Sequence, residues 1–149
     1  MQLKTKNFGE IDYEPTSVIV FEEGLPAFEH LTRFILLADS PEDLFQWLQS
    51  TEDEDLAFTL MDVGQIKPDY KPRIAPDALA DIDDGTPMLY YNIAVVPEDL
   101  EKMRVNLRAP IVINKSLRRG KQVVANNEEY GLRHYIFDEI RPNGQVVEC

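Results

Sequence analysis

The stretch VNLRAPIVINKSLRRGKQVVA occupies residues 105–125, and its β-branched runs at 111–113 and 123–124 predict two neighbouring antiparallel strands. Pro110 stands just before the first run, where a missing backbone N–H does no harm to a sheet. The polar connection contains Gly120, and we expect Asn114 and the basic residues after it to be solvated, with Leu117 tucked back onto the sheet. The predicted core and the only concentrated basic surface therefore lie side by side.

Short apolar or alternating runs predict further strands along the rest of the chain. They lie around Gly9 and at residues 17–21, 33–37, 45–50, 56–61, 88–96, 135–137 and 145–147. The run 88–96 is apolar almost throughout, so we expect it to be central and covered on both faces. Gly24 and Pro26 predict a turn that folds Leu25 and Phe28 inward.

Two prolines predict short helical turns between strands, because proline suits the first position of a helix. Pro76 would begin one turn, with Ala75, Leu79 and Ile82 spaced along one face. Pro97 would begin the other, with Glu98 and Asp99 near its positive end.

Four consecutive acids, Glu52, Asp53, Glu54 and Asp55, form the predicted tip of a hairpin between residues 45–50 and 56–61. They lack the ligand spacing of a calcium loop, so a solvated turn is the simpler interpretation. Residues 81–85 resemble such a loop only superficially, since no Glu follows at its closing position.

Composition limits the class of protein. The chain has 149 residues, enough for one domain with its own core over 1–149. No run of about 18 apolar residues could span a membrane, and the N-terminus lacks the apolar core of a signal peptide. The single cysteine, Cys149, can form neither an internal disulfide nor a cysteine-based metal cluster. These features predict a cytoplasmic protein.

The net charge is −12 and it is unevenly placed. Residues 1–100 carry 21 acids and 6 bases, whereas residues 101–149 carry 6 acids and 9 bases. An acidic surface repels phosphate backbones, so we expect a basic protein partner and no direct contact with nucleic acid. Acids that merely keep the domain soluble are the alternative.

No pattern of residues points to catalysis. His30 and His134 are the only histidines, too few for a histidine-based metal site without carboxylates. Nucleophile-elbow, zinc-protease and phosphate-loop motifs are missing from the sequence. We therefore expect no catalytic residue, metal, cofactor or small-molecule substrate.

Three blocks, which with their spacing cover roughly residues 2–135, resemble the flagellar assembly factor FliW family. The first block is TKNFGEI at 5–11 followed by FEEGLPAFE at 21–29. The second is FQWLQS at 45–50 with DLAF at 55–58, and the third is NLRAPIVIN at 106–114 with RGKQVV at 119–124. Glu22 and Ala27 depart from the family, which often has Pro and Gly there, and residues 138–149 form an extension without a family counterpart.

The resemblance implies a mainly β fold, a small, strongly bent antiparallel β-barrel-like domain with few short helices. It also implies a non-enzymatic regulator of flagellum biogenesis that binds newly made flagellin and, alternatively, the RNA-binding translational repressor CsrA. When flagellin is scarce, the free protein would sequester CsrA and relieve repression of flagellin translation. The family-motif residues to which we assign a structural role are Gly24, Leu25, Pro26, Phe28, Trp47, Leu48, Pro110, Ile111, Ile113, Asn114 and Gly120.

The acidic residues are the candidates for partner binding. Glu52, Asp53, Glu54, Asp55, Glu98 and Asp99 are dense in carboxylate and lie on predicted connections, so we expect them to face CsrA. Simple solvation of these carboxylates is the alternative. The rival functions are a plain flagellin chaperone without CsrA control and an acidic metal-dependent enzyme.

Overall fold

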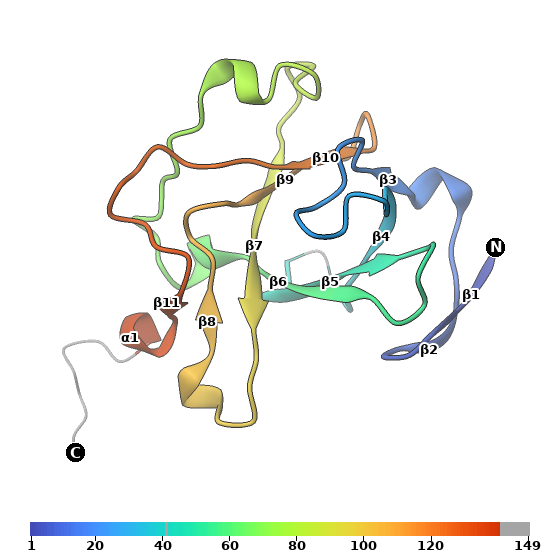
Figure 1. Ribbon diagram of the computed structural model, residues 1–149, viewed down its shortest axis with the longest axis horizontal. Coiled ribbons are helices and arrows are strands. Elements are labelled where there is room, and N and C mark those ends of the chain that lie inside the picture. The colour runs from blue at the N-terminus through green and yellow to red at the C-terminus, as the bar shows by residue number, and fades with distance from the viewer. Residues whose placement is uncertain (41, 141–149) are drawn as a thin grey trace.

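Seven strands close into a barrel (Figure 1). The computed structural model describes residues 1–40 and 42–140. The barrel strands are β3 (Ile19–Val20), β4 (Arg33–Leu37), β5 (Phe45–Ser50), β6 (Ala57–Met61), β7 (Leu89–Val95), β9 (Ile111–Asn114) and β10 (Arg119–Gln122). Their order is β7-β6-β5-β4-β3-β10-β9, and pairing of β7 with β9 closes the barrel. The expected barrel-like fold is confirmed, and only the β3–β10 pair is parallel.

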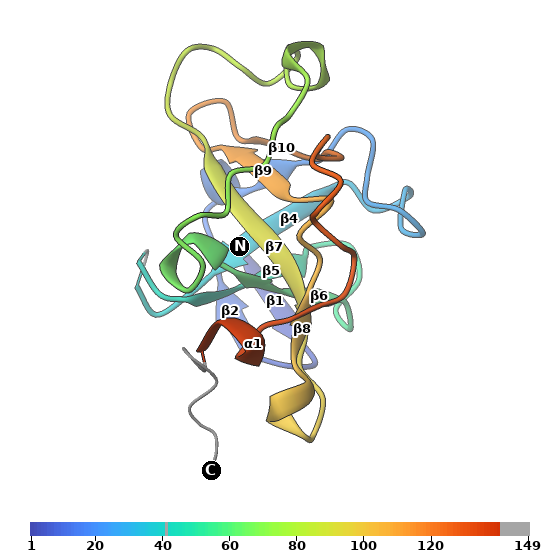
Figure 2. The same cartoon turned by 90° about the vertical axis from the view of Figure 1, so that its left-hand side faces the viewer.

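The remaining elements extend the barrel. They are β1 (Gln2–Thr5), β2 (Gly9–Asp12), β8 (Arg104–Val105), β11 (His134–Tyr135), the 3-10 turns η1 (Pro15–Ser17), η2 (Val63–Gln65), η3 (Pro76–Ala78) and η4 (Leu100–Lys102), and the helix α1 (Phe137–Ile140). β1 and β2 form a separate hairpin, while β8 and β11 continue the sheet beyond β7. The connection from η2 to β7, residues 66–88, contains η3 and is called the η3 loop. Figure 2 shows the η3 loop and the η4 turn projecting from opposite ends of the molecule. Among the described residues, no helix has the length and apolar character needed to cross a membrane.

Aromatic and aliphatic side chains fill the barrel. The rings of Phe21 and Phe34 meet edge to face at 5.4 Å between centroids, and both side chains are fully buried. Leu48, Leu60 and Ile111 complete the same cluster without exposed surface. Burial of large apolar side chains is the main stabilising term of folding, so this cluster holds the barrel together.

The predicted hairpin of β5 and β6 forms, but β5 is buried on both faces. Gln46 and Gln49 are almost completely buried, although the alternation of apolar and polar residues predicted a half-buried strand. The β1–β2 hairpin covers the outer face, since the ring of Phe8 packs against Trp47 at 5.8 Å. The Nε2 group of Gln49 donates to the carbonyl of Ser50 at 2.9 Å, which satisfies the buried donor.

The second strand of the opening stretch is displaced from its predicted position. β10 is Arg119–Gln122, so Val123 and Val124 follow the strand instead of forming it. Gly120 pairs with Ile113, and a Cβ at Gly120 would lie only 2.4 Å from Cζ of Phe21. This close contact leaves room only for glycine at position 120. Gly120 therefore lies inside the strand and not in the connection that the sequence had suggested.

Smaller differences concern exposure around the same hairpin. Asn114 is fully buried rather than solvated, and Leu117 is 40% exposed rather than tucked against the sheet. The prediction that β7 is covered on both faces is also wrong, because Tyr90 and Val95 are 40% and 45% exposed.

The predicted helical turns form as 3-10 turns. η3 begins with Pro76 as expected. η4 begins at Leu100 rather than at Pro97, because the side chain of Asp99 caps it by accepting from the N–H of Glu101. Near the C-terminus the strand is His134–Tyr135 and residues 137–140 are helical, whereas the predicted strand 145–147 lies outside the described residues.

Candidate functional site

The acidic turn between β5 and β6 is tightly built, and two of its four carboxylates serve the fold. Oε1 of Glu52 accepts from the backbone N–H of Thr32 at 2.8 Å and of Arg33 at 3.1 Å. Oδ1 of Asp53 accepts from the N–H of Asp55 at 3.0 Å. A carboxylate that accepts backbone bonds is oriented by them, so these two acids fix the shape of the turn.

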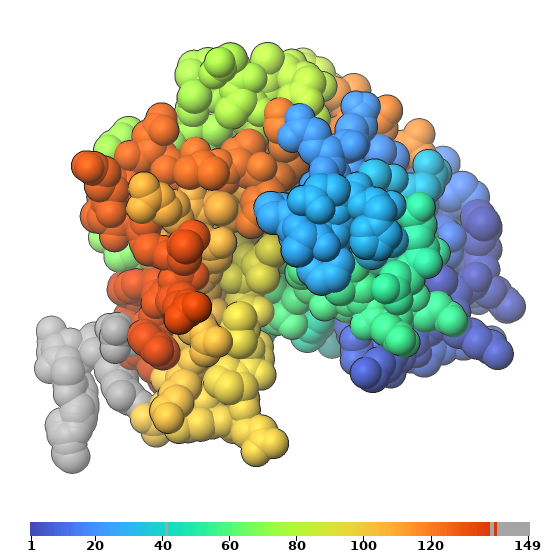
Figure 3. All heavy atoms as spheres, viewed as in Figure 1, coloured from blue at the N-terminus to red at the C-terminus, as the bar shows by residue number. Residues whose placement is uncertain are grey.

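Glu54 and Asp55 present their carboxylates to solvent. Both residues are exposed. Within the described part of the chain, neither carboxylate has a hydrogen-bond or ion-pair partner, although the carbonyl of Glu54 accepts from the N–H of Lys6 at 3.1 Å. Figure 3 shows the loop of residues 24–32 as a bulge beside this turn. The free charge of the turn is thus carried on a backbone that neighbouring segments hold in place.

The second acidic pair lies on the turn between β7 and β8. Oδ1 of Asp99 accepts from the N–H of Glu101 at 3.2 Å, as the cap of η4. Glu98 is exposed, and its carboxylate has no partner among the described residues. Figure 1 places this turn and the β5–β6 turn at separate corners of the molecule. The fold therefore presents two acidic tips and does not join them into one cluster.

Most of the family-motif residues lie inside the molecule. Gly24, Leu25, Leu48, Pro110, Ile111, Ile113, Asn114 and Gly120 are buried, Phe28 and Trp47 are partly buried, and Pro26 is exposed. Gly24 has φ +65°, and a Cβ on it would lie 2.5 Å from Cα of Glu29. Only glycine fits that conformation and that contact together.

Asn114 organises the polar side of the β9–β10 hairpin. Its Nδ2 donates to the carbonyl of Ile82 at 2.7 Å and to Oδ1 of Asp84 at 2.9 Å. Its Oδ1 accepts from the N–H of Leu117 at 3.1 Å. Hydrogen bonds from Thr86 and Asn114 lower the pKa of the exposed Asp84 carboxyl to about 2. The acid of the apparent calcium loop thus ties the η3 loop to the barrel.

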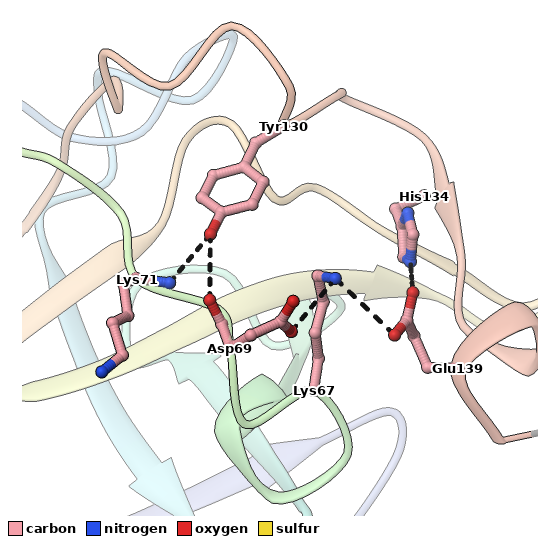
Figure 4. A network of polar contacts seen from close by, with 6 residues as sticks. All are labelled: Lys67, Asp69, Lys71, Tyr130, His134 and Glu139. Carbon is pink, nitrogen blue, oxygen red and sulfur yellow. Dashed lines mark hydrogen bonds and ion pairs between the residues drawn. The ribbon is translucent and has the colours of Figure 1, made fainter. Parts of the chain in front are cut away.

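A polar network joins the segment after β6 to the C-terminal region (Figure 4). Nζ of Lys67 lies 3.2 Å from Oδ1 of Asp69 and 3.6 Å from Oε1 of Glu139. Nε2 of His134 lies 2.8 Å from the other oxygen of Glu139. Burial alone would lower the pKa of Lys67, but the hydrogen bond to Asp69 and the charge of Glu139 outweigh it and raise that pKa.

Tyr130 completes this network through the backbone. Its hydroxyl accepts from the N–H of Lys71 at 2.9 Å and donates to the carbonyl of Asp69 at 3.4 Å. The Lys67–Glu139 ion pair and the two hydrogen bonds of the Tyr130 hydroxyl join residues 67–71 to residues 130–139, so the network works as a tether. Sequence reasoning missed it, because no motif links residues so far apart in the chain.

The described residues present exposed charges on turns that hydrogen bonds hold in shape. Within them, no group of three or more His, Cys, Asp or Glu side chains is placed to hold a metal ion. His30 is exposed, and His134 is engaged with Glu139. The arrangement offers charged tips on a rigid frame.

The family comparison agrees with the blocks noted in the sequence. The sequence model of the family described as "FliW protein" matches residues 2–136. The chain is 43% identical over 144 residues to the flagellar assembly factor FliW of Thermoanaerobacter pseudethanolicus, covering 95% of this chain and 96% of that protein. It is 36% identical over 152 residues to the flagellar assembly factor FliW of Thermotoga maritima, covering 99% and 100% of the two.

A solved structure shares the fold. The crystal structure of a flagellar assembly factor FliW superposes with a TM-score of 0.83 at 31% sequence identity, covering 92% of this chain and 97% of the other. The likeness extends over the barrel and its additions.

Proposed function

Because this chain belongs to the FliW family, whose named relatives are flagellar assembly factors, we propose that it binds flagellin and, alternatively, the translational repressor CsrA. In this scheme the protein sequesters CsrA while flagellin is scarce, and flagellin translation proceeds. Accumulating flagellin occupies the protein and releases the repressor. The protein acts in the cytoplasm, without catalysis and without touching RNA itself.

Three carboxylates support the proposal that this protein binds CsrA. Glu54, Asp55 and Glu98 are exposed, and among the described residues none of them has an internal partner. They stand on turns that Glu52, Asp53 and Asp99 hold in shape. Preset negative charge on rigid turns favours a basic protein partner through faster encounter and through specificity.

The test neutralises the free carboxylates and spares the ones that shape the turns. Glu54→Gln with Asp55→Asn removes charge from one tip, and Glu98→Gln removes it from the other. CsrA affinity is measured by calorimetry at two salt concentrations. Each exposed pair contributes only about 0.2–1 kcal/mol, so the single substitutions should be nearly silent and the combined variant clearly weaker, with a smaller salt dependence.

Glu52→Gln is the matched control for structure, because it removes charge from a carboxylate that accepts two backbone bonds. It should lower stability more than it lowers CsrA affinity. Unchanged affinity and unchanged salt dependence in the combined variant would refute the assignment of the acidic tips to CsrA.

The rival functions give distinct results in the same experiments. A plain flagellin chaperone would bind flagellin and leave CsrA untouched. A metal-dependent enzyme would bind a divalent cation in calorimetry and would fail to capture flagellin.

A further inference from the structure

A hollow of about 370 Å³ opens at one mouth of the barrel. It lies where η1 leads into β3, where β4 ends, and beside the turn between β9 and β10. Ile19 and Leu36 form an apolar wall, and the buried Gln46 also lines it. Lys115 and Arg118 stand at its rim. Barrel mouths of this size and mixed polarity are a common place for ligand sites.

The charge of this hollow is opposite to that of the protein. The chain has 27 acids and 15 bases, yet two bases and no carboxylate line this hollow. Three other hollows on the described surface each include at least one carboxylate, contributed by Asp62, by Asp12 and Glu14, or by Glu22, Glu23 and Asp81. Arg119 lines a different hollow, together with Glu22, Glu23 and Asp81. Lys115 and Arg118 form no ion pair within residues 1–40 and 42–140. Their positive charge is therefore available to a ligand.

The backbone of Arg118, at the rim of the hollow, is in a strained conformation. Its φ of 55° lies in the left-handed region, which favours glycine or asparagine in a tight hairpin turn. The contacts that its backbone makes do not require arginine, since the carbonyl of Arg118 accepts from the N–H of Val20 at 2.9 Å. The side chain of Arg118 lines the hollow and makes one long hydrogen bond, from Nη1 to the carbonyl of Pro15 at 3.4 Å, so the strained backbone points to a use of the guanidinium at the hollow.

We propose that this barrel mouth binds an acidic segment of a protein partner, with one aliphatic side chain against Ile19 and Leu36 and its carboxylates beside Lys115 and Arg118. The apolar contact supplies affinity, and the exposed cations supply orientation and encounter rate. Nucleic acid fits less well, because no aromatic side chain lines the hollow for base stacking and the whole protein is strongly acidic. The inference goes beyond the proposed function, which assigns acidic tips to a basic partner.

The test uses the full chain and a defined probe. The probe is a fluorescein-labelled nine-residue peptide, blocked at both ends, with a central Leu flanked on each side by four Asp or Glu residues. Two comparison peptides replace the Leu by Ser, or all acids by Asn and Gln. Binding is measured by fluorescence anisotropy at low and at physiological salt, with a single-stranded RNA oligonucleotide as a fourth probe.

Arg118→Gly is the decisive variant, because it removes the charge and relieves the left-handed strain together. We expect it to weaken peptide binding about tenfold, as loss of a charge pair at an interface does, while the melting temperature stays equal or rises. Lys115→Glu should weaken binding as well. Lys71→Glu, the same charge change at an exposed lysine away from the hollow, should leave binding within about twofold.

Several results would overturn the proposal. The first is that the Leu peptide does not bind, and the second is that the Leu and Ser peptides bind equally well. The third is that Arg118→Gly binds the Leu peptide as tightly as the wild type does. The fourth is that the RNA oligonucleotide binds more tightly than the Leu peptide. Flagellin and CsrA affinities of the wild-type chain are measured in parallel. If both partners bind while the peptide does not, only this inference fails; if the peptide binds and neither partner does, only the proposed function fails.

Discussion

At the scale of single residues, the barrel contains positions where adding or removing one or two side-chain atoms disturbs the packing. Gly120 lies in β10 directly beneath the ring of Phe21, and Val123 follows with 5% of its surface exposed. Protein interiors are close-packed, so a change of one or two methyl groups at such positions is felt. Surface neighbours such as Val124, which is 64% exposed, escape this constraint.

Gly120→Ala should lower the free energy of unfolding by about 1–3 kcal/mol, because the added Cβ would sit 2.4 Å from a fully buried ring. Urea denaturation measures the difference. Gly131→Ala is the control, since a Cβ there would meet no atom within 4 Å. If both variants unfold at the same urea concentration, the predicted clash at Gly120 is absent.

Adjacent valines provide a second test of the core. Val123→Ala should cost about 2 kcal/mol, because two methyl groups leave a cluster formed with Val112, Leu79 and Ile82. Val124→Ala should change stability by less than about half a kcal/mol, because that side chain is mostly in water. Ile111→Ala, at the centre of the barrel, should cost about 2–4 kcal/mol. Equal melting temperatures for the two valine variants would show that the core is assigned wrongly.

At the scale of elements, the η3 loop is attached to the barrel by two kinds of contact. Leu79 and Ile82 pack on Val112 and Val123. Asn114 supplies the polar part through its bonds to Ile82 and Asp84. A side chain from β9, together with the ion pair of Lys121 with Asp81 at 3.2 Å, thereby holds the loop in place.

The attachment predicts a pH dependence of stability. The pKa of Asp84 is lowered from 3.8 to about 2 in the folded chain, so the folded state favours the ionised carboxylate. The stabilisation is therefore complete above pH 3.8 and is lost as the pH falls through about 2. The stability gap between the wild type and Asp84→Asn should narrow over this interval.

Denaturation at a series of pH values measures that gap. Thr86→Ala removes the hydroxyl that donates to Asp84, so in its background the gap should be smaller and should stop narrowing at a higher pH. A gap that stays constant from pH 5 to pH 2 would contradict the role of the ionised carboxylate.

At the scale of the whole molecule, the proposed partners must share a limited surface. The protein exposes 8712 Å², and a typical interface takes about 800 Å² from each partner. The acidic tips stand at two corners, and the basic hollow lies at a mouth of the barrel. The proposed switch requires the two partner sites to overlap or to be coupled through the sheet.

Flagellin and CsrA should therefore each weaken the binding of the other. Linkage requires the two effects to be equal in binding free energy. Titration of flagellin into a complex with labelled CsrA should release the label, and the reverse titration should release flagellin. A stable ternary complex with both affinities unchanged would leave the protein a flagellin chaperone without control of CsrA.

Local sequence pattern determined most of the strands, the β5–β6 hairpin with its acidic tip, and the proline that opens η3, but not β8 or the position of β10. Alternation, β-branching and turn residues act over a few neighbours, so such features can be predicted from short windows. The three family blocks determined the barrel and the membership in a family of flagellar assembly factors, because several motifs in a fixed order are specific when one alone is not.

Only the tertiary structure decided which residues of those strands are inside and what their polar groups bind. β10 lies two to four residues earlier than its valines suggested because the ring of Phe21, distant in the chain, needs a glycine beneath it. The η3 loop supplies the acceptors for the buried Nδ2 of Asn114, and the β5–β6 turn supplies those for the buried Nε2 of Gln49. The hollow beside Arg118 exists only once β3, β4 and the β9–β10 turn are brought together. Contacts between distant segments set these features, and no local window of sequence contains both partners.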